Sequence, residues 1–129
     1  MKECEWCTYK EKEFLLFETS YWKVYLADVQ DYIGRCIVVL KRHCGNMSEL
    51  NMQEWIELKE AIDVLELCFN SVLGAELCNW SCLMNSFYKD ENPNPHLHML
   101  EPGRIDHSES NRNNQSELIR NSQCTCMAN

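Results

Sequence analysis

The chain has 129 residues, of which 45% are apolar and 25% are charged. This length and this balance fit one globular domain with its own core, and they exclude a fibrous or wholly disordered chain. Twenty acidic residues against twelve basic ones give a net charge of −8, which would repel a phosphate backbone and therefore argues against general nucleic-acid binding.

The N-terminal segment, residues 1–14, carries charges where a signal peptide is apolar, and no apolar run approaches the roughly 20 residues of a membrane-spanning helix. We therefore expect a cytoplasmic protein with no membrane partner. The nine cysteines are odd in number, so in that compartment most of them should be free thiols. Four lie among apolar residues and should act as small hydrophobes: Cys36, Cys68, Cys78 and Cys82.

Cys4 and Cys7 form a C-x-x-C pair near the N-terminus. Two sulfurs at this spacing can converge on one zinc ion, but they supply only half of a four-ligand site. A redox-active pair would instead follow a strand and begin a helix, because the helix dipole lowers the thiol pKa. Residues 8–18 favour a turn and a strand, so redox chemistry is the weaker hypothesis.

The first elements along the chain are predicted strands. Residues 14–18 and 21–27 are rich in aromatic and β-branched residues and are separated by Thr19 and Ser20, which predicts a hairpin. Residues 34–41 form a nearly continuous apolar run and predict a buried central strand, followed by His43.

A long helix should follow these strands. Asn51 and Glu54 have the spacing of a capping box, and Gly74 is suited to end the helix. Between them, apolar residues recur at three- and four-residue steps and share one face, which we expect to pack on the sheet. These residues are Trp55, Leu58, Ile62, Leu65, Phe69 and Val72.

The C-terminal half predicts a strand over 77–87, a proline-broken loop over 88–95 and a strand over 96–100. Residues 106–129 are mostly polar and cannot bury enough surface to order themselves. The predicted folded unit is therefore 4–105, with a disordered tail over 106–129. Its fold class is α+β, an antiparallel sheet covered on one side by a long helix.

His96 and His98 narrow the search for function. Side chains two apart in a strand point to the same face at ~6.6 Å, so both imidazoles should face one pocket while Leu97 and Met99 enter the apolar side. Imidazole is a nucleophile, an acid, a base or a metal ligand near neutral pH. Taken alone, the H-x-H pair is weak evidence for catalysis, because unrelated strands carry such pairs as metal ligands or as plain polar surface.

The order of the segments adds context. CEWC, GRCIVVLKRH, a long helix, LMNSFYKDENPNP and HLHM together resemble the histidine-triad superfamily of nucleotide hydrolases and transferases over about 100 of the 129 residues. The most specific part, NPNPHLHM, is similar to the start of the family signature H-φ-H-φ-H-φ-φ, where φ is apolar. Leu100 stands where the third histidine is usual, and the Pro-Arg pair appears only as Pro102, Gly103 and Arg104. A decayed copy, a frame change near residue 100 and a true variant all fit this departure.

The resemblance implies that His98 attacks the α-phosphate of a purine nucleotide or dinucleoside polyphosphate and forms a nucleotidyl-histidine intermediate, in a homodimer. A neutral imidazole is a competent nucleophile and leaving group. Leu100 cannot transfer a proton, and loss of general acid catalysis typically costs about 10²–10⁴-fold in rate. His107, in the tail, is expected to be solvated and not to replace the missing histidine.

The resemblance also implies substrate contacts. Asn85 matches the family asparagine that contacts phosphate, and Asn92 matches a polar residue near the leaving group. Lys41, Arg42 and Arg104 can supply local positive charge in this acidic protein. Each has a plain alternative, because asparagines also form turns and exposed cations also serve only as solvated surface.

Many bacterial members bind a structural zinc, and the positions that match their ligands are Cys4, Cys7, His43 and His96. A closed set of four protein ligands is typical of a structural zinc site. The alternative is a hydrogen-bonded His96 beside an unligated cysteine pair.

Base recognition is left open by the sequence. The hairpin aromatics can wall a purine pocket or simply fill the core: Phe14, Phe17, Tyr21, Trp22 and Tyr25. The leading hypothesis is a nucleotide hydrolase or transferase that acts through His98. Its rivals are a catalytically impaired, zinc-stabilised nucleotide-binding module and a thiol-redox protein.

Overall fold

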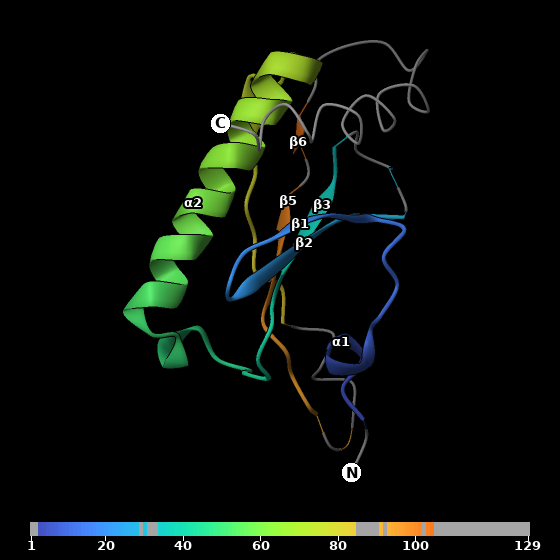
Figure 1. Ribbon diagram of the computed structural model, residues 1–129, viewed down its shortest axis with the longest axis vertical. Helices are drawn as coiled ribbons and strands as arrows, with labels where there is room; N and C mark the ends of the chain where they lie inside the picture. The colour runs from blue at the N-terminus through green and yellow to red at the C-terminus, as the bar shows by residue number, and fades with distance from the viewer. Residues whose placement is uncertain are drawn as a thin grey trace.

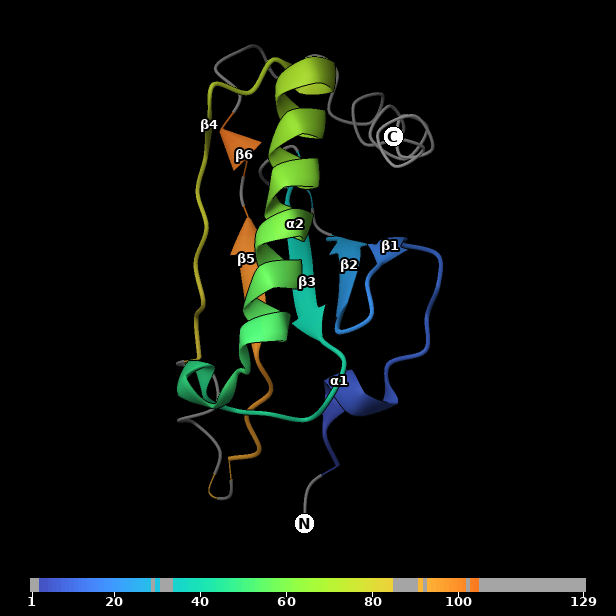
Figure 2. The same cartoon turned by 60° about the vertical axis from the view of Figure 1, so that its left-hand side comes forward.

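The computed structural model describes residues 3–28, 30, 34–84, 91, 93–101 and 103–104, and for residues 100, 101, 103 and 104 it describes the backbone alone. Four antiparallel strands form the main sheet in the order β1-β2-β3-β5. They are β1 (Leu15–Glu18), β2 (Trp22–Leu26), β3 (Cys36–Leu40) and β5 (His98–Glu101). Figures 1 and 2 show the long helix α2 (Met52–Cys68) lying along one face of this sheet. The predicted α+β class is confirmed.

The strands form as their side chains predict. β1 and β2 pair as the expected hairpin, with Glu18 opposite Lys23. β3 lies between β2 and β5, and Val38 faces Val24 on one side and Met99 on the other. β-branched side chains suit such a central strand because they pack well on a pleated surface. The predicted buried central strand is therefore confirmed.

Helix α2 begins and ends as its sequence dictates. Asn51 accepts a hydrogen bond from the backbone N–H of Glu54 at 2.9 Å, and the Glu54 carboxylate accepts from the N–H of Asn51 at 3.0 Å. The last turn, η2 (Phe69–Leu73), is π-helical and stops at Gly74, whose φ of 64° is left-handed. Glycine reaches this region without the steric cost that other residues bear.

The buried face of α2 and η2 matches the predicted one at Leu58, Leu65 and Phe69, but not at its N-terminal end. Trp55 is 38% exposed, whereas Glu54 is fully buried, so the prediction for Trp55 is wrong. At this end the buried position is taken by Glu54, whose capping carboxylate turns inward and is bound by Arg42. Ile62 and Val72 only partly reach the core. The residues of α2 and η2 that fill it are Leu58, Ala61, Leu65, Phe69 and Leu73.

The predicted strand over 77–87 is much shorter in the structure. β4 (Leu77–Cys78) pairs only with β6 (Gly103–Arg104) in a two-stranded sheet, and residues 82–84 have no regular structure. A strand extends only where a partner supplies hydrogen bonds, and β6 has two residues. Positions 85–87 lie outside the described residues, as does the predicted tail over 106–129.

Two shorter segments complete the described part of the chain. The single-turn helix α1 (Glu5–Thr8) contains Cys7, and the 3-10 turn η1 (Met47–Glu49) precedes α2. Neither was predicted. None of the helices in the described ranges has the length and apolarity that a membrane crossing requires.

Candidate functional site

His98 lies on the face of the sheet that α2 leaves uncovered. It pairs with Val39 at the start of β5. Its chain neighbours Leu97 and Met99 point the other way, since Leu97 is a core residue and Met99 packs against the core. Side chains alternate along extended backbone, so the half-buried His98 ring belongs to the opposite, open face. The predicted separation of His98 from Leu97 and Met99 is confirmed. The prediction that both imidazoles face one pocket from a strand over 96–100 is not, because β5 begins at His98 and the ring of His96 is fully buried.

The surroundings of His98 define its tautomer. Nδ1 lies 3.0 Å from the carbonyl oxygen of His96, and a carbonyl only accepts, so Nδ1 carries the proton and donates. In a neutral imidazole the lone pair is then on Nε2. The ring also lies against Trp6, with ring centroids 5.9 Å apart and planes tilted by 34°. This arrangement is that of an oriented imidazole with Nε2 as its basic atom.

A cavity of about 230 Å³ opens on the same side of the sheet. Its aromatic lining comes from Trp6, Tyr9, Phe14 and Tyr25, and Glu5 and Asp28 add carboxylates. Trp6 thus contacts both the cavity and the ring of His98. Trp6, Tyr9 and Asp28 were not predicted as site residues. The one signal that the sequence offered was an aromatic residue inside the C-x-x-C pair.

The five aromatic residues of the predicted hairpin divide between the core and a pocket, which are the two possibilities that the sequence left open. Trp22 is 1% exposed in the core, and its indole N–H donates to the carbonyl of Glu54 at 2.8 Å. Phe17 and Tyr21 pack against the core. Phe14 and Tyr25 line the cavity. Two of the five aromatics therefore line a pocket, and both are also in packed surroundings, since Phe14 packs against the core and Tyr25 is 5% exposed.

Cys4, Cys7, His43 and His96 converge at one point, as the resemblance implied. Their ligand atoms all lie within 4.8 Å of one another. Sγ of Cys4 is 3.3 Å from Nδ1 of His96, and Sγ of Cys7 is 3.4 Å from Nδ1 of His43 and 3.5 Å from Nδ1 of His96. Two thiols and two imidazoles at these distances are a donor set that can hold a metal ion.

His96 is oriented by the fold to offer Nδ1. Its ring is fully buried, and Nε2 donates to the carbonyl of Leu40 at 2.6 Å. This bond places the lone pair on Nδ1, toward the sulfurs. Burial lowers the pKa of His96, and the rings of His43 and His98 lower it further against the effect of the Leu40 bond. His96 is thus kept neutral, which is the form that binds metals.

The cysteine pair lies at the helix α1. Cys4 is its N-cap residue and is half-buried, whereas Cys7 is exposed. Burial raises the pKa of the Cys7 thiol, and the hydrogen bond and charge of Cys4 raise it further. A redox-active thiol needs a lowered pKa. The direction of the Cys7 pKa is thus opposite to that of a redox-active thiol, whereas the position of the pair at the start of a short helix, which was not predicted, is one that such thiols favour.

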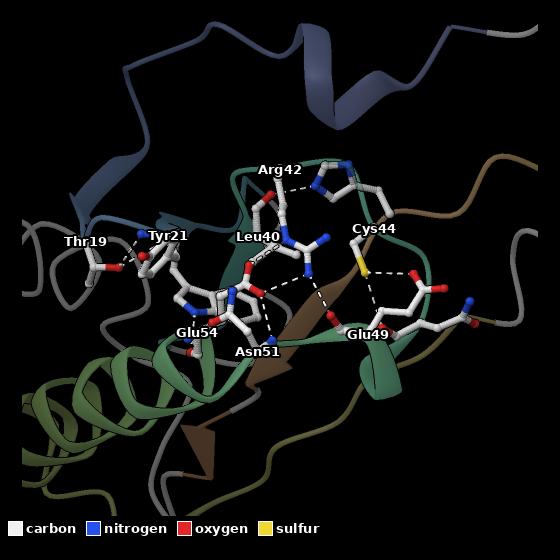
Figure 3. Close-up of polar contacts among 11 residues, drawn as sticks. Thr19, Tyr21, Leu40, Arg42, Cys44, Glu49, Asn51 and Glu54 are labelled. Atoms are coloured by element: carbon white, nitrogen blue, oxygen red, sulfur yellow. Dashed lines mark hydrogen bonds and ion pairs between the residues drawn. The ribbon is translucent and has the colours of Figure 1, made fainter.

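Arg42 serves the fold instead of a phosphate site. Figure 3 shows its guanidinium reaching Glu54, and the Nε to Oε2 distance is 2.8 Å. A second nitrogen donates to Oε1 of Glu54 at 2.9 Å and to the carbonyl of Glu49 at 2.8 Å. The hydrogen bond from Arg42 lowers the pKa of Glu54 against the opposing effect of burial. Lys41 lies 3.6 Å from Glu18 in an exposed ion pair.

The remaining candidate site residues either lie outside the described residues or are described by their backbone alone. Asn85 and Asn92 lie outside the described residues. Arg104 is described by its backbone, in β6. The backbone of Leu100 pairs with Ile37, two positions beyond His98 on β5. These predicted substrate contacts stay predictions.

The amino-acid sequence matches no protein-family model and no curated protein. The fold, however, matches solved structures. A zinc-bound histidine triad family protein from Mycobacterium smegmatis is 12% identical over 92% of this chain and 88% of its own, with a TM-score of 0.67. A hypothetical histidine triad nucleotide-binding protein from Sulfolobus tokodaii is 16% identical over 95% and 93%, with a TM-score of 0.63. A diadenosine triphosphate hydrolase from Plasmodium falciparum, solved with cyclomarin A, is 10% identical over 94% and 79%, with a TM-score of 0.64.

These likenesses give the chain the fold of the histidine-triad proteins, as the segment order predicted.

Proposed function

We propose that the protein is a member of the histidine-triad superfamily that acts on a purine nucleotide, either a nucleoside phosphoramidate or a dinucleoside polyphosphate. The observation that carries the proposal is the position of His98. Its ring lies on the open face with Nδ1 bound to the His96 carbonyl, and it contacts Trp6, which also walls an aromatic cavity. An aromatic cavity beside an oriented imidazole fits a base next to a nucleophile.

In the proposed first step, Nε2 of His98 donates its lone pair to the α-phosphorus. The bond from phosphorus to the leaving oxygen or nitrogen breaks, and the leaving group takes the electron pair and a proton from solvent. Water then attacks the same phosphorus and loses a proton, while the bond to His98 breaks and returns the lone pair to Nε2. The carbonyl of His96 favours this path because it accepts from Nδ1 while the ring is charged.

The cavity supplies the proposed nucleoside site. Its aromatic side chains offer flat apolar surfaces for a purine, and Asp28 offers an acceptor for ribose hydroxyls. Asn85, Asn92 and Arg104 are proposed to contact the phosphates. Homodimerisation and a cytoplasmic location are further proposals, and light scattering at several protein concentrations tests the first.

Zinc is the metal that best fits the Cys4, Cys7, His43 and His96 set, because two thiolates and two imidazoles form a closed tetrahedral shell. Such an ion would be structural, joining the N-terminal segment to the residues that flank β3 and β5. The bond from Nε2 of His96 to Leu40 supports this role, since ligating histidines usually donate their other N–H to a fixed acceptor. Cobalt substitution tests the proposal, because a tetrahedral thiolate site colours the protein and Cys7→Ser should abolish the band.

The activity is tested by incubating the full chain with adenosine phosphoramidate or a diadenosine polyphosphate. We expect AMP release and, after a rapid alkaline quench that preserves phosphorus–nitrogen bonds, an AMP adduct on His98 by mass analysis. His98→Asn should lose both. His107→Asn is the matched histidine control and should keep both. AMP release by the His98→Asn protein at the original rate would contradict the proposal.

The second candidate function is a nucleotide-binding module with impaired catalysis. Leu100 favours it, because an apolar side chain cannot protonate a leaving group. Binding of AMP without turnover of either substrate would support this candidate over the first.

A further inference from the structure

Trp6 lies between the cysteine–histidine set and the cavity beside His98. In the sequence it lies between Cys4 and Cys7, and it belongs to α1. Its ring is 5.9 Å from the ring of His98 and 6.3 Å from that of Tyr25, between centroids. One side chain therefore connects the cysteine pair to the proposed nucleophile and to the wall of the cavity.

The contacts within α1 itself are too few to hold this helix in place. The helix has four residues, and none of them is buried. Its internal hydrogen bonds include the Thr8 N–H to the Cys4 carbonyl at 3.2 Å and the Thr8 hydroxyl to the same oxygen at 3.1 Å. A single turn does not persist in water on such bonds, because helix nucleation is unfavourable.

Side-chain contacts must therefore fix α1 on the sheet. Cys4 and Cys7 reach Nδ1 of His96, and Cys7 also reaches His43. The aromatic contacts form the second anchor: Tyr9 packs edge-on against Tyr25, with centroids 5.2 Å apart. Without a metal, the thiols supply only weak hydrogen bonds at the first anchor.

We propose that a zinc ion bound by the cysteine–histidine cluster holds Trp6 against the His98 ring and thereby completes the wall of the nucleotide cavity. Trp6 is a positioning residue in this arrangement, and the metal acts on the reacting imidazole through it. The inference rests on the proposed zinc site, and its effect on ligand affinity rests on the proposed nucleotide function.

The test follows the ring protons of His98 by NMR in the full chain, with the resonance assigned by its loss in His98→Asn. An indole beside an imidazole shifts the imidazole protons. We expect this shift in zinc-loaded protein, its loss after chelation, its return with added zinc, and its absence in Trp6→Ala at all zinc levels. Trp6→Phe, which keeps an aromatic ring, should retain part of the shift. Trp55→Ala, on α2, should retain all of it.

A second readout is AMP affinity by calorimetry. Chelation and Trp6→Ala should each weaken binding about tenfold, and chelation of the Trp6→Ala protein should add little, because both remove the same contact. The indole N–H resonance of Trp22, which is buried and bonded to Glu54, reports the fold during chelation.

An identical His98 shift with and without zinc would overturn the inference and leave the zinc site standing. Failure of zinc to bind would overturn both. Loss of the Trp22 resonance on chelation would also overturn it, because the metal would then support the whole fold. A zinc-dependent His98 shift without any AMP binding would support the coupling and reject the proposed nucleotide function.

Discussion

Nε2 of His96 donates a hydrogen bond to the carbonyl of Leu40 at 2.6 Å, with the imidazole fully buried. This bond joins the last residue of β3 to the segment that leads into β5. It also turns Nδ1 of the same ring toward Cys4 and Cys7. A single side chain thus serves the packing of the sheet and the cysteine–histidine cluster, and the two roles are separable by experiment.

His96→Ala should destabilise the metal-free protein by about 2 kcal/mol, because it leaves a cavity and a buried carbonyl without its donor. Urea denaturation in the presence of a chelator measures this loss. His43→Ala is the matched control, since His43 is exposed and should weaken zinc binding with little change in metal-free stability. Equal destabilisation by both variants would contradict the assignment of roles.

The carboxylate of Glu54 should make the stability of the protein depend on pH in the acid range. The bond from Arg42 lowers the pKa of Glu54 in the folded state. The stabilisation is therefore complete above the unfolded pKa, at about 4.3, and is lost as the pH falls through the lower folded pKa. Glu54→Gln should flatten this part of the curve in urea denaturation series, whereas Asp63→Asn, at an exposed ion pair on α2, should not.

Leu100→His should raise turnover of a diadenosine polyphosphate by about 10²-fold or more, since it adds a group that can protonate the leaving phosphate. The gain should be smaller with adenosine phosphoramidate, because its amine leaves more easily once protonated by solvent. Steady-state AMP release measures both. Leu100→Asn is polar but transfers no proton, so a gain of the same size with Leu100→Asn would reject the acid-catalysis argument.

Gly74→Ala should lower the free energy of unfolding by about 1 kcal/mol. A Cβ at this position meets no atom within 4 Å, so the cost comes from the left-handed φ of 64° alone. Gly74→Asn should cost less because asparagine tolerates this conformation better. Urea denaturation midpoints compare the two, and an unchanged midpoint for Gly74→Ala would contradict the argument.

Local signals in the sequence predicted much of the fold. The Asn51 and Glu54 capping box marks the start of α2 correctly, and the apolar run before His43 is the central strand. The helix face was predicted correctly at Leu58, Leu65 and Phe69 and wrongly at Trp55, because counting apolar positions cannot reveal that Arg42 pairs with a buried Glu54. The strand over 77–87 was missed because its length depends on a partner that lies far along the chain.

Only part of the candidate site was predicted, because its residues come from segments that lie far apart along the chain. Neither the spacing nor the composition of the sequence predicts that Cys4 and Cys7 lie beside His43 and His96. Only the resemblance to the histidine-triad superfamily implied this set of four ligands. Trp6 escaped notice because a residue within a C-x-x-C pair belongs to no periodic pattern. The roles of Asn85, Asn92 and Arg104, the tail, the homodimer and the cytoplasmic location stay predictions.

The contact between Nδ1 of His98 and the carbonyl of His96 has an evolutionary consequence. The acceptor is a main-chain atom, so no single amino-acid replacement can delete it. The four residues of the proposed zinc site, in contrast, offer side-chain atoms, which single replacements can remove. Variants that lose the proposed zinc site can therefore keep the imidazole of His98 aimed in the same direction.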